Sequence, residues 1–346
     1  MSQRIVELMQ APQQARNLPW LKGALQCALE LELSTLPPYL CGQWALEDQG
    51  SDAAKLIGSV TQDEMSHLGL VCNLLGATGQ QPQIFTGYDS IIYPGSLPGG
   101  VRPKCDPNFF PVDPNFQVVL GFEKYSDFVR MAMQIEYPED PVPRPLLAGA
   151  AETFPSIGEF YDAVLQALQD NDGKFPYQTD KQLENDNPNV FVIDGLLKAT
   201  TAVSTIQKQG EGSPRFPFAD PERKELAHFY VFGELFYGKR YVFDDKTQTG
   251  DWSGDPVQIP GVRPMTPVPP GGYPMTPPAG VLACDTVFTQ LLQQLDQAWG
   301  NGDPNALADA VGTMFALKKA SIDLLQQQIP RPDGGIYGPQ FKKRSA

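Results

Sequence analysis

Two tetrapeptides of the same form carry both histidines of this chain, Glu64-Met65-Ser66-His67 and Glu225-Leu226-Ala227-His228. Residues three apart on an α-helix share a face, so each tetrapeptide directs a carboxylate and an imidazole to the same side. Two such pairs, each joined by a glutamate from another helix, form the ligand set of a carboxylate-bridged di-metal site in a helix bundle. The spacing therefore predicts a metal centre.

Two long helices are expected to position the first pair. Asn17 and Pro19 are typical of a helix start, and the doublet Pro37-Pro38 is expected to kink or end this first helix before it resumes over 39–46. A second helix is expected between Ser51 and Gly79. Glu64 and His67 lie on its apolar stripe, which favours ligands over surface polar residues.

Further helices are expected over 122–136, 156–169, 192–209, 222–240, 285–299 and 305–328. The fourth of these would bring Glu225 and His228 to a buried stripe. Residues 80–120 are rich in Gly and Pro and predict a loop-rich insertion with a few short strands at most. The predicted fold is all-α, a four-helix bundle with long loop insertions and extra C-terminal helices. Its predicted parts are the bundle (1–243), a Pro/Gly-rich extended segment (244–283), a helical pair packed on the bundle (284–330) and a frayed basic tail (331–346).

The two remaining glutamates of the ligand set are chosen by their position on the expected helices. Glu32 shares a stripe with apolar residues and is preferred, with Glu30 as the alternate. Glu211 ends the helix before the second tetrapeptide, where antiparallel packing would bring it level with Glu225. Tyr39 stays near the same face as Glu32 and is a candidate phenol beside the metal, or a core residue.

Three other glutamates are expected not to bind metal: Glu234 as a structural residue, and Glu123 and Glu136 at the surface or as local caps. A hydrogen-bonded polar core without metal is the alternative to a metal site. The alternative is less favoured because burying lone carboxylates is costly and the stripes carry no Lys or Arg.

Composition and charge indicate which partners and which compartment to expect. A net charge of −14 argues against nucleic acid and anionic membranes, both of which need a basic face. The N-terminus lacks the uninterrupted apolar core of a signal peptide, and no run of about 18 apolar residues follows. Five cysteines without a Cys-x-x-Cys pair fit buried thiols in a reducing compartment. A cytoplasmic protein is expected.

Several segments together resemble one known family. The segments are ALELELSTLPPYL (28–40), DEMSHL (63–68), NLL (73–75), QGEG (209–212) and ELAHFY (225–230). They are similar to the ferritin-like domain named after iminophenylpyruvate dimer synthase, which occurs in violacein and rebeccamycin pathway enzymes. The resemblance covers about residues 15–240. It implies a ferritin-like fold with six metal ligands, which are Glu32, Glu64, His67, Glu211, Glu225 and His228.

The expected function is a di-iron oxidase or oxygenase that uses O₂ on a small molecule in secondary metabolism, either aromatic or derived from a 2-oxo or imino acid. Carboxylate and imidazole ligands suit two Fe ions, with Mn or a mixed Fe/Mn pair as alternatives. No haem is expected, because both histidines are assigned to the di-metal site and the pathway enzymes are much larger. A separate reductase and an oligomer are compatible with this function. The alternatives are a ferroxidase that handles iron and a non-catalytic ferritin-like scaffold.

Overall fold

The computed structural model describes residues 5–100, 116–138, 156–184, 187–210, 217–273 and 276–344. The described residues form helices with two small antiparallel sheets, in agreement with the predicted all-α class. The α-helices are α1 (Ile5–Met9), α2 (Leu18–Ala45), α3 (Asp52–Ala77), α4 (Ile84–Gly87), α5 (Tyr125–Ile135), α6 (Ile157–Asp170), α7 (Leu196–Gly210), α8 (His228–Tyr237), α9 (Ala279–Asn301) and α10 (Pro304–Gln327). Short 3₁₀ turns occupy Gln13–Ala15, Tyr88–Ser90 and Pro98–Gly100.

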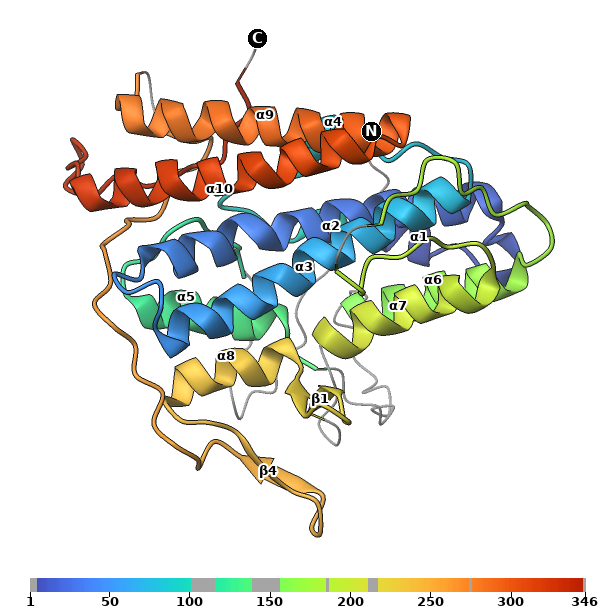
Figure 1. Ribbon diagram of the computed structural model, residues 1–346, viewed down its shortest axis with the longest axis horizontal. Helices are drawn as coiled ribbons and strands as arrows, with labels where there is room; N and C mark the ends of the chain where they lie inside the picture. Colours follow the sequence, from blue (N-terminus) through green and yellow to red (C-terminus); the bar gives the residue numbers. More distant parts are fainter. Residues whose placement is uncertain are drawn as a thin grey trace.

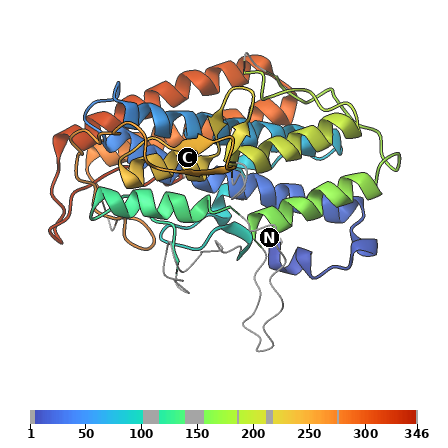
Figure 2. The same ribbon diagram turned by 90° about the horizontal axis from the view of Figure 1, so that it is seen from below.

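The four-helix bundle has two continuous helices and two composite ones. The long helices α2 and α3 pack side by side along their length. Opposite them, two short helices in succession make up each of the other two positions of the bundle. The third position is made of α5 and α6, and the fourth of α7 and α8 (Figure 1). Figure 2 shows the shorter helices from the side opposite α9 and α10. The breaks in both composite helices lie at the middle of the bundle.

The helix α2 runs straight through the proline doublet that was expected to kink or end it. Pro37 and Pro38 are both inside the helix. Pro38 lacks the N–H that would bond the carbonyl of Ser34, and the hydroxyl of Tyr93 donates to that carbonyl instead, at 2.6 Å. A side chain from the Gly/Pro-rich insertion therefore replaces the missing backbone donor, which sequence periodicity could not show.

Single residues explain where α3 starts and how closely α2 and α5 pack. The Ser51 side chain accepts the N–H of Ala54, as expected of an N-cap. Gly42 on α2 lets the ring of Phe128 on α5 approach closely, because a Cβ at Gly42 would lie only 2.1 Å from that ring. These contacts determine where α3 begins and how closely α5 packs on α2.

The prediction of a helix over 222–240 is wrong for the residues before His228. Strands β1 (Phe218–Asp220) and β2 (Glu225–Leu226) form a hairpin, and α8 starts only at His228. The Asp220 side chain accepts the N–H groups of Glu222 and Arg223, which closes a turn in place of a helical start. This turn ends the helical register before it can include Glu225.

The C-terminal third covers the bundle. Helices α9 and α10 pack against each other and lie across α2 and α3, away from the composite helices (Figure 1). A second hairpin, β3 (Val242–Asp244) with β4 (Thr249–Asp251), projects from the opposite side (Figure 1). The Pro-rich chain that follows carries no helix among its described residues, and isolated bridges join it to Leu46 and Phe122.

The tail is packed where the sequence suggested fraying. Gln340 and Phe341 are buried. The carboxylate of Asp285 on α9 accepts the Gln340 amide at 2.7 Å and the Lys342 backbone N–H at 3.1 Å, and Tyr88 donates to the Phe341 carbonyl at 2.8 Å. Burial raises the pKa of Asp285 to about 6.

Candidate metal centre

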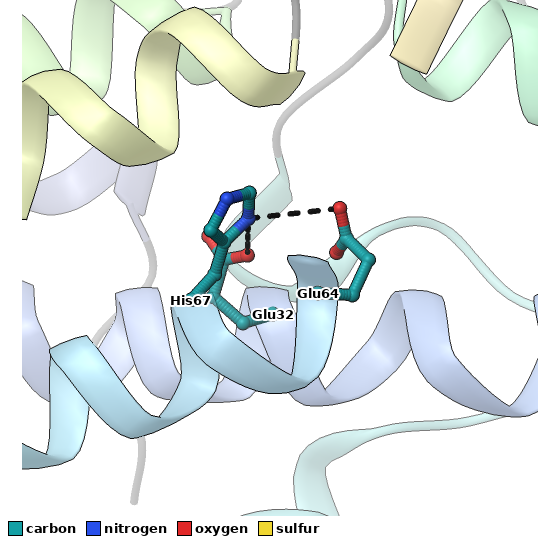
Figure 3. A group of neighbouring side chains, drawn as sticks. All are labelled: Glu32, Glu64 and His67. Carbon is teal, nitrogen blue, oxygen red and sulfur yellow. Dashed lines mark ion pairs between the residues drawn. The ribbon is translucent and has the colours of Figure 1, made fainter. Parts of the chain in front are cut away.

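The long helices supply three buried ligands. Glu32 comes from α2, and Glu64 and His67 come from adjacent turns of α3 (Figure 3). The Nδ1 atom of His67 lies 3.4 Å from Glu32 Oε2 and 3.7 Å from Glu64 Oε1. All three side chains are at most 5% exposed. Of the two glutamates that the sequence left open on α2, Glu32 is therefore the one at the cluster.

The composite helices supply two more residues at their breaks. Glu136 follows the last residue of α5 and acts as its C-cap, and His228 is the first residue of α8. His228 Nδ1 lies 3.0 Å from Glu64 Oε1 and 3.5 Å from Glu136 Oε2. The helix breaks thus place one carboxylate and one imidazole opposite Glu64.

These five residues form two triads that share one member. Glu32, Glu64 and His67 form the first, and Glu64, Glu136 and His228 form the second. In each triad one donor atom per residue lies within 4.8 Å of the others, which is a spacing that a metal ion can bridge. Glu64 stands between the two positions.

Each of the three carboxylates has one oxygen held by a hydroxyl. Thr35 donates to Glu64 Oε2 at 2.5 Å, Tyr161 of α6 donates to Glu32 Oε1, and Tyr39 donates to Glu136 Oε1. The second oxygens, Glu32 Oε2, Glu64 Oε1 and Glu136 Oε2, face the two imidazole Nδ1 atoms. The hydroxyls therefore orient the carboxylates and leave one oxygen of each directed inward.

The outer nitrogens of both histidines are joined by a polar chain. His67 Nε2 lies 2.9 Å from Gln209 Oε1, Gln209 Nε2 donates to Asp63 Oδ1 at 3.1 Å, and His228 Nε2 lies 3.4 Å from Asp63 Oδ2. The Asp63 carboxylate turns the amide N–H of Gln209 toward itself, so the amide oxygen faces His67. Both Nε2 atoms then carry the proton, and both Nδ1 atoms are free to bind metal.

The electrostatics of the cluster favour a bound cation. Burial, and next the neighbouring Glu136 carboxylate, raise the pKa of Glu64. Burial lowers the pKa of His228, but the carboxylates of Asp63, Glu136 and Glu64 outweigh it and raise the pKa well above its usual value. The pKa of His67 is raised in the same way, since Glu32 and Glu64 offset burial. Three buried carboxylates so close together need positive charge between them.

Tyr39 lies where the sequence put a candidate phenol. Burial, followed by the charge of Glu136, raises its pKa well above the usual value, so its hydroxyl stays protonated as a donor.

One atom of the cluster shows that its residues fit a metal ion. His228 Nδ1 is buried and makes no well-formed hydrogen bond to the described residues, although two carboxylate oxygens lie within 3.5 Å. A buried imidazole nitrogen that faces two carboxylate oxygens without a well-formed hydrogen bond to either has the arrangement of a metal ligand beside other ligands. Imidazole nitrogens and carboxylate oxygens are donors that suit iron and manganese.

Of the six ligands expected from sequence, Glu32, Glu64, His67 and His228 lie in this cluster. Glu225 lies on β2 with its side chain 54% exposed, 3.9 Å from Arg223, so its expected place one turn before His228 is wrong. Glu211 lies outside the described residues.

Other glutamates have separate partners. Glu30 is buried but bonds Gln26 and Ser90, and Glu234 forms an ion pair with Arg240 at 2.7 Å, consistent with a structural position.

Glu136 is the main residue that the sequence interpretation missed. It was placed at the surface or in a local cap, but it is only 5% exposed and lies in the second triad. The signal was its spacing, because Phe128, Ala132 and Glu136 recur every four residues and the first two are buried core. Asp63, Gln209 and Tyr161 were also not anticipated.

A small cavity opens beside the first triad. It is lined by Leu31, Glu32, Thr35, Glu64, His67, Ile135, Glu136, Ile157, Gly158, Tyr161, Ile206, Gln207 and Gly210. The space open to water-sized guests is about 30 Å³, and one water needs roughly 10–15 Å³ on the same measure.

The geometry and comparisons with known proteins agree on the family. The ferritin-like family matches residues 25–237, more than half of the chain, and the chain belongs to it. A crystal structure of a ferritin-like protein from Caulobacter vibrioides is 25% identical and superposes with a TM-score of 0.60. The match covers 94% of this chain and 99% of that one. Comparison with curated proteins gave no match. Of the helices in the described part of the chain, none is long and apolar enough to cross a membrane.

Proposed function

We propose that the two triads bind two divalent metal ions bridged by Glu64, and that the ions are iron. The observation that supports this most directly is the sharing of Glu64 between two sets of one imidazole and two carboxylates. Glu32 and His67 would hold one ion, and Glu136 and His228 the other. Manganese, or one ion of each metal, uses the same donors and is the alternative that metal analysis decides.

Such a centre supplies the means to reduce O₂ and to oxidise a bound molecule. The residues of the chain hold the ligands and limit the space around them to small guests. Thr35, Tyr39 and Tyr161 fix the carboxylates, while Gln209 and Asp63 fix the imidazoles. Aliphatic side chains from α2, α5, α6 and α7 line the cavity and keep its dielectric constant low.

The activity we propose is that of an oxidase or oxygenase acting on a small organic molecule, in keeping with the resemblance to the iminophenylpyruvate dimer synthase family. An aromatic or 2-oxo or imino acid-derived substrate is the class that this resemblance suggests. Neither histidine is left to hold a haem, and electrons would come from a separate reductase.

A second function is favoured by the size of the cavity. About 30 Å³ admits a metal ion, water or O₂, whereas an aromatic acid needs several times that space. Oxidation of Fe(II) itself, as in a ferroxidase, requires only such small guests. Anaerobic loading with Fe(II) followed by exposure to O₂ separates the two functions, because a ferroxidase keeps consuming O₂ as more Fe(II) is added.

Metal analysis of matched variants tests the metal site. We expect about two ions per chain in the wild type. Glu64→Ala should lose both ions because it removes a ligand from each triad, and Glu32→Ala or Glu136→Ala should lose one. Glu30→Gln is the control, since Glu30 is equally buried two positions from Glu32 but has other partners. A folded wild-type protein that binds no divalent metal would leave a non-catalytic scaffold as the function.

A further inference from the structure

The two ends of the cluster differ in what surrounds them. All three members of the first triad line the cavity, and so does Glu136 of the second, whereas His228 and Tyr39 are absent from the described lining. Tyr39 packs on Phe232 with ring centroids 5.1 Å apart, and Phe232 packs on Phe128 at 6.2 Å. Aromatic rings therefore pack beside Tyr39, and the cavity lies on the side of the cluster that carries His67, not His228.

The walls of the cavity are apolar. Leu31, Ile135, Ile157 and Ile206 present aliphatic side chains that offer no ligand or proton to a guest. These apolar walls suit small molecules, and the polar groups that such a guest meets are the inward carboxylate and imidazole atoms and the side chains of Thr35, Tyr161 and Gln207.

The narrowest wall is the end of α7. Gly210 is the last residue of α7, and a Cβ added there would stand 3.6 Å from Glu136 Oε2. A side chain longer than that of alanine would therefore extend into the carboxylates. Ile206, one turn earlier on the same helix, lines the same cavity and is 4% exposed.

Two side-chain hydroxyls, those of Thr35 and Tyr161, border both the cavity and the ligands, and Tyr161 is the phenol of the pair. Tyr161 lines the cavity and donates to Glu32 Oε1, on the His67 side of the cluster. The corresponding phenol of the His228 side, Tyr39, donates to Glu136 but is absent from the described lining. A guest beside Glu32 therefore meets the oxygen of Tyr161.

We propose that small molecules reach the cluster at its Glu32–His67 end through this cavity, that Ile206 and Gly210 limit their size, and that Tyr161 is the phenol they meet. The inference rests on the proposed metal site and adds a direction of entry to it. Molecules of two or three heavy atoms, such as O₂, are the class that fits the space.

Azide is a suitable probe because it has three atoms and binds open metal positions. Protein loaded with Co(II) is mixed rapidly with azide, and the rate and extent of binding are followed by the visible ligand-field absorption. Ile206→Phe should slow binding about tenfold. Azide would have to move an overpacked ring aside, and the free energy of that displacement adds to the barrier for entry. Ile206→Ala should bind azide at least as fast as the wild type.

The controls separate entry from loosening of the helix. Val203→Ala removes two methyl groups from a fully buried side chain of α7 that is outside the described lining, and it should bind azide at the wild-type rate. Tyr161→Phe should change the equilibrium affinity for azide at least threefold, whereas Tyr39→Phe should change it less, with cobalt content measured for every variant.

The outcomes distinguish this inference from the proposed function. Wild-type protein that takes up no cobalt would overturn both. Loaded protein whose azide kinetics are the same in Ile206→Phe, Ile206→Ala and the wild type would overturn the inference alone. Equal effects of Tyr161→Phe and Tyr39→Phe would remove Tyr161 from it.

Discussion

Gln209 should control metal affinity at the first triad without being a ligand. Its amide oxygen accepts from His67 Nε2 at 2.9 Å, and its N–H donates to Asp63 at 3.1 Å. With Gln209→Leu, metal bound at His67 Nδ1 would leave the Nε2–H buried without an acceptor. In the metal-free protein, at a pH above the raised pKa of His67, the neutral imidazole can instead place its proton on Nδ1, toward Glu32, so the penalty there falls mainly on the metal-bound state.

The magnitude follows from that single unpaired group. A buried donor left without a partner costs about 1–3 kcal/mol, which corresponds to metal affinity roughly 5-fold to 150-fold weaker. Competition between the protein and a chelator for Co(II) measures the affinity. Because the chain has only two histidines, ¹⁵N NMR of the Zn(II)-loaded, histidine-labelled protein should resolve the ring nitrogens and report which one carries the proton.

The control is a glutamine of similar burial and bonding. Gln182 is 7% exposed against 9% for Gln209, and its amide bonds the backbone of Gln178 and Ile193. Gln182→Leu should lower the melting temperature and leave metal affinity unchanged. If Gln209→Leu binds metal like the wild type, with the same histidine spectra, the polar chain does not set the tautomer.

Three further predictions concern single groups. Glu225→Gln should keep the wild-type metal content by elemental analysis, because Glu225 is exposed on β2; loss of an ion would return it to the ligand set. Tyr93→Phe should lower the free energy of unfolding by about 1–3 kcal/mol in urea titration, because the Ser34 carbonyl opposite Pro38 loses its donor; no change would show that water replaces the hydroxyl. The buried Asp285 has a pKa raised from 3.8 to about 6, so its folded state holds the proton more tightly and stability falls as pH rises through that window. The stability of the wild type relative to Asp285→Asn should therefore drop by about 2 kcal/mol between pH 4 and 6, and a constant difference would contradict the raised pKa.

Sequence periodicity predicted the half of the site that lies on continuous helices. Glu32, Glu64 and His67 sit on α2 and α3, where the register of an apolar stripe directly gives the buried face. It also indicated that His228 faces inward. The position of the neighbouring Glu225 could not be predicted the same way, because the turn closed by Asp220 interrupts the helical register between them.

The remaining parts of the site depend on tertiary contacts. Glu136 follows the end of a helix and has no histidine in register with it, so its place on the apolar stripe indicates burial but does not separate a metal ligand from a buried cap. The Gln209–Asp63 chain joins residues 146 positions apart, and Tyr161 meets Glu32 across 129 positions. Such pairings depend on how helices pack, which a single sequence does not show.

The division of the bundle into continuous and broken helices implies an order of assembly. The α2–α3 hairpin is local in sequence and can form early, with Glu32, Glu64 and His67 already in place. Glu136 and His228 arrive from distant segments, and Asp63 and His228 are separated by 165 positions. A metal ion captured by the early hairpin would attract the late segments and stabilise their docking, so metal supply during synthesis should raise the yield of folded protein.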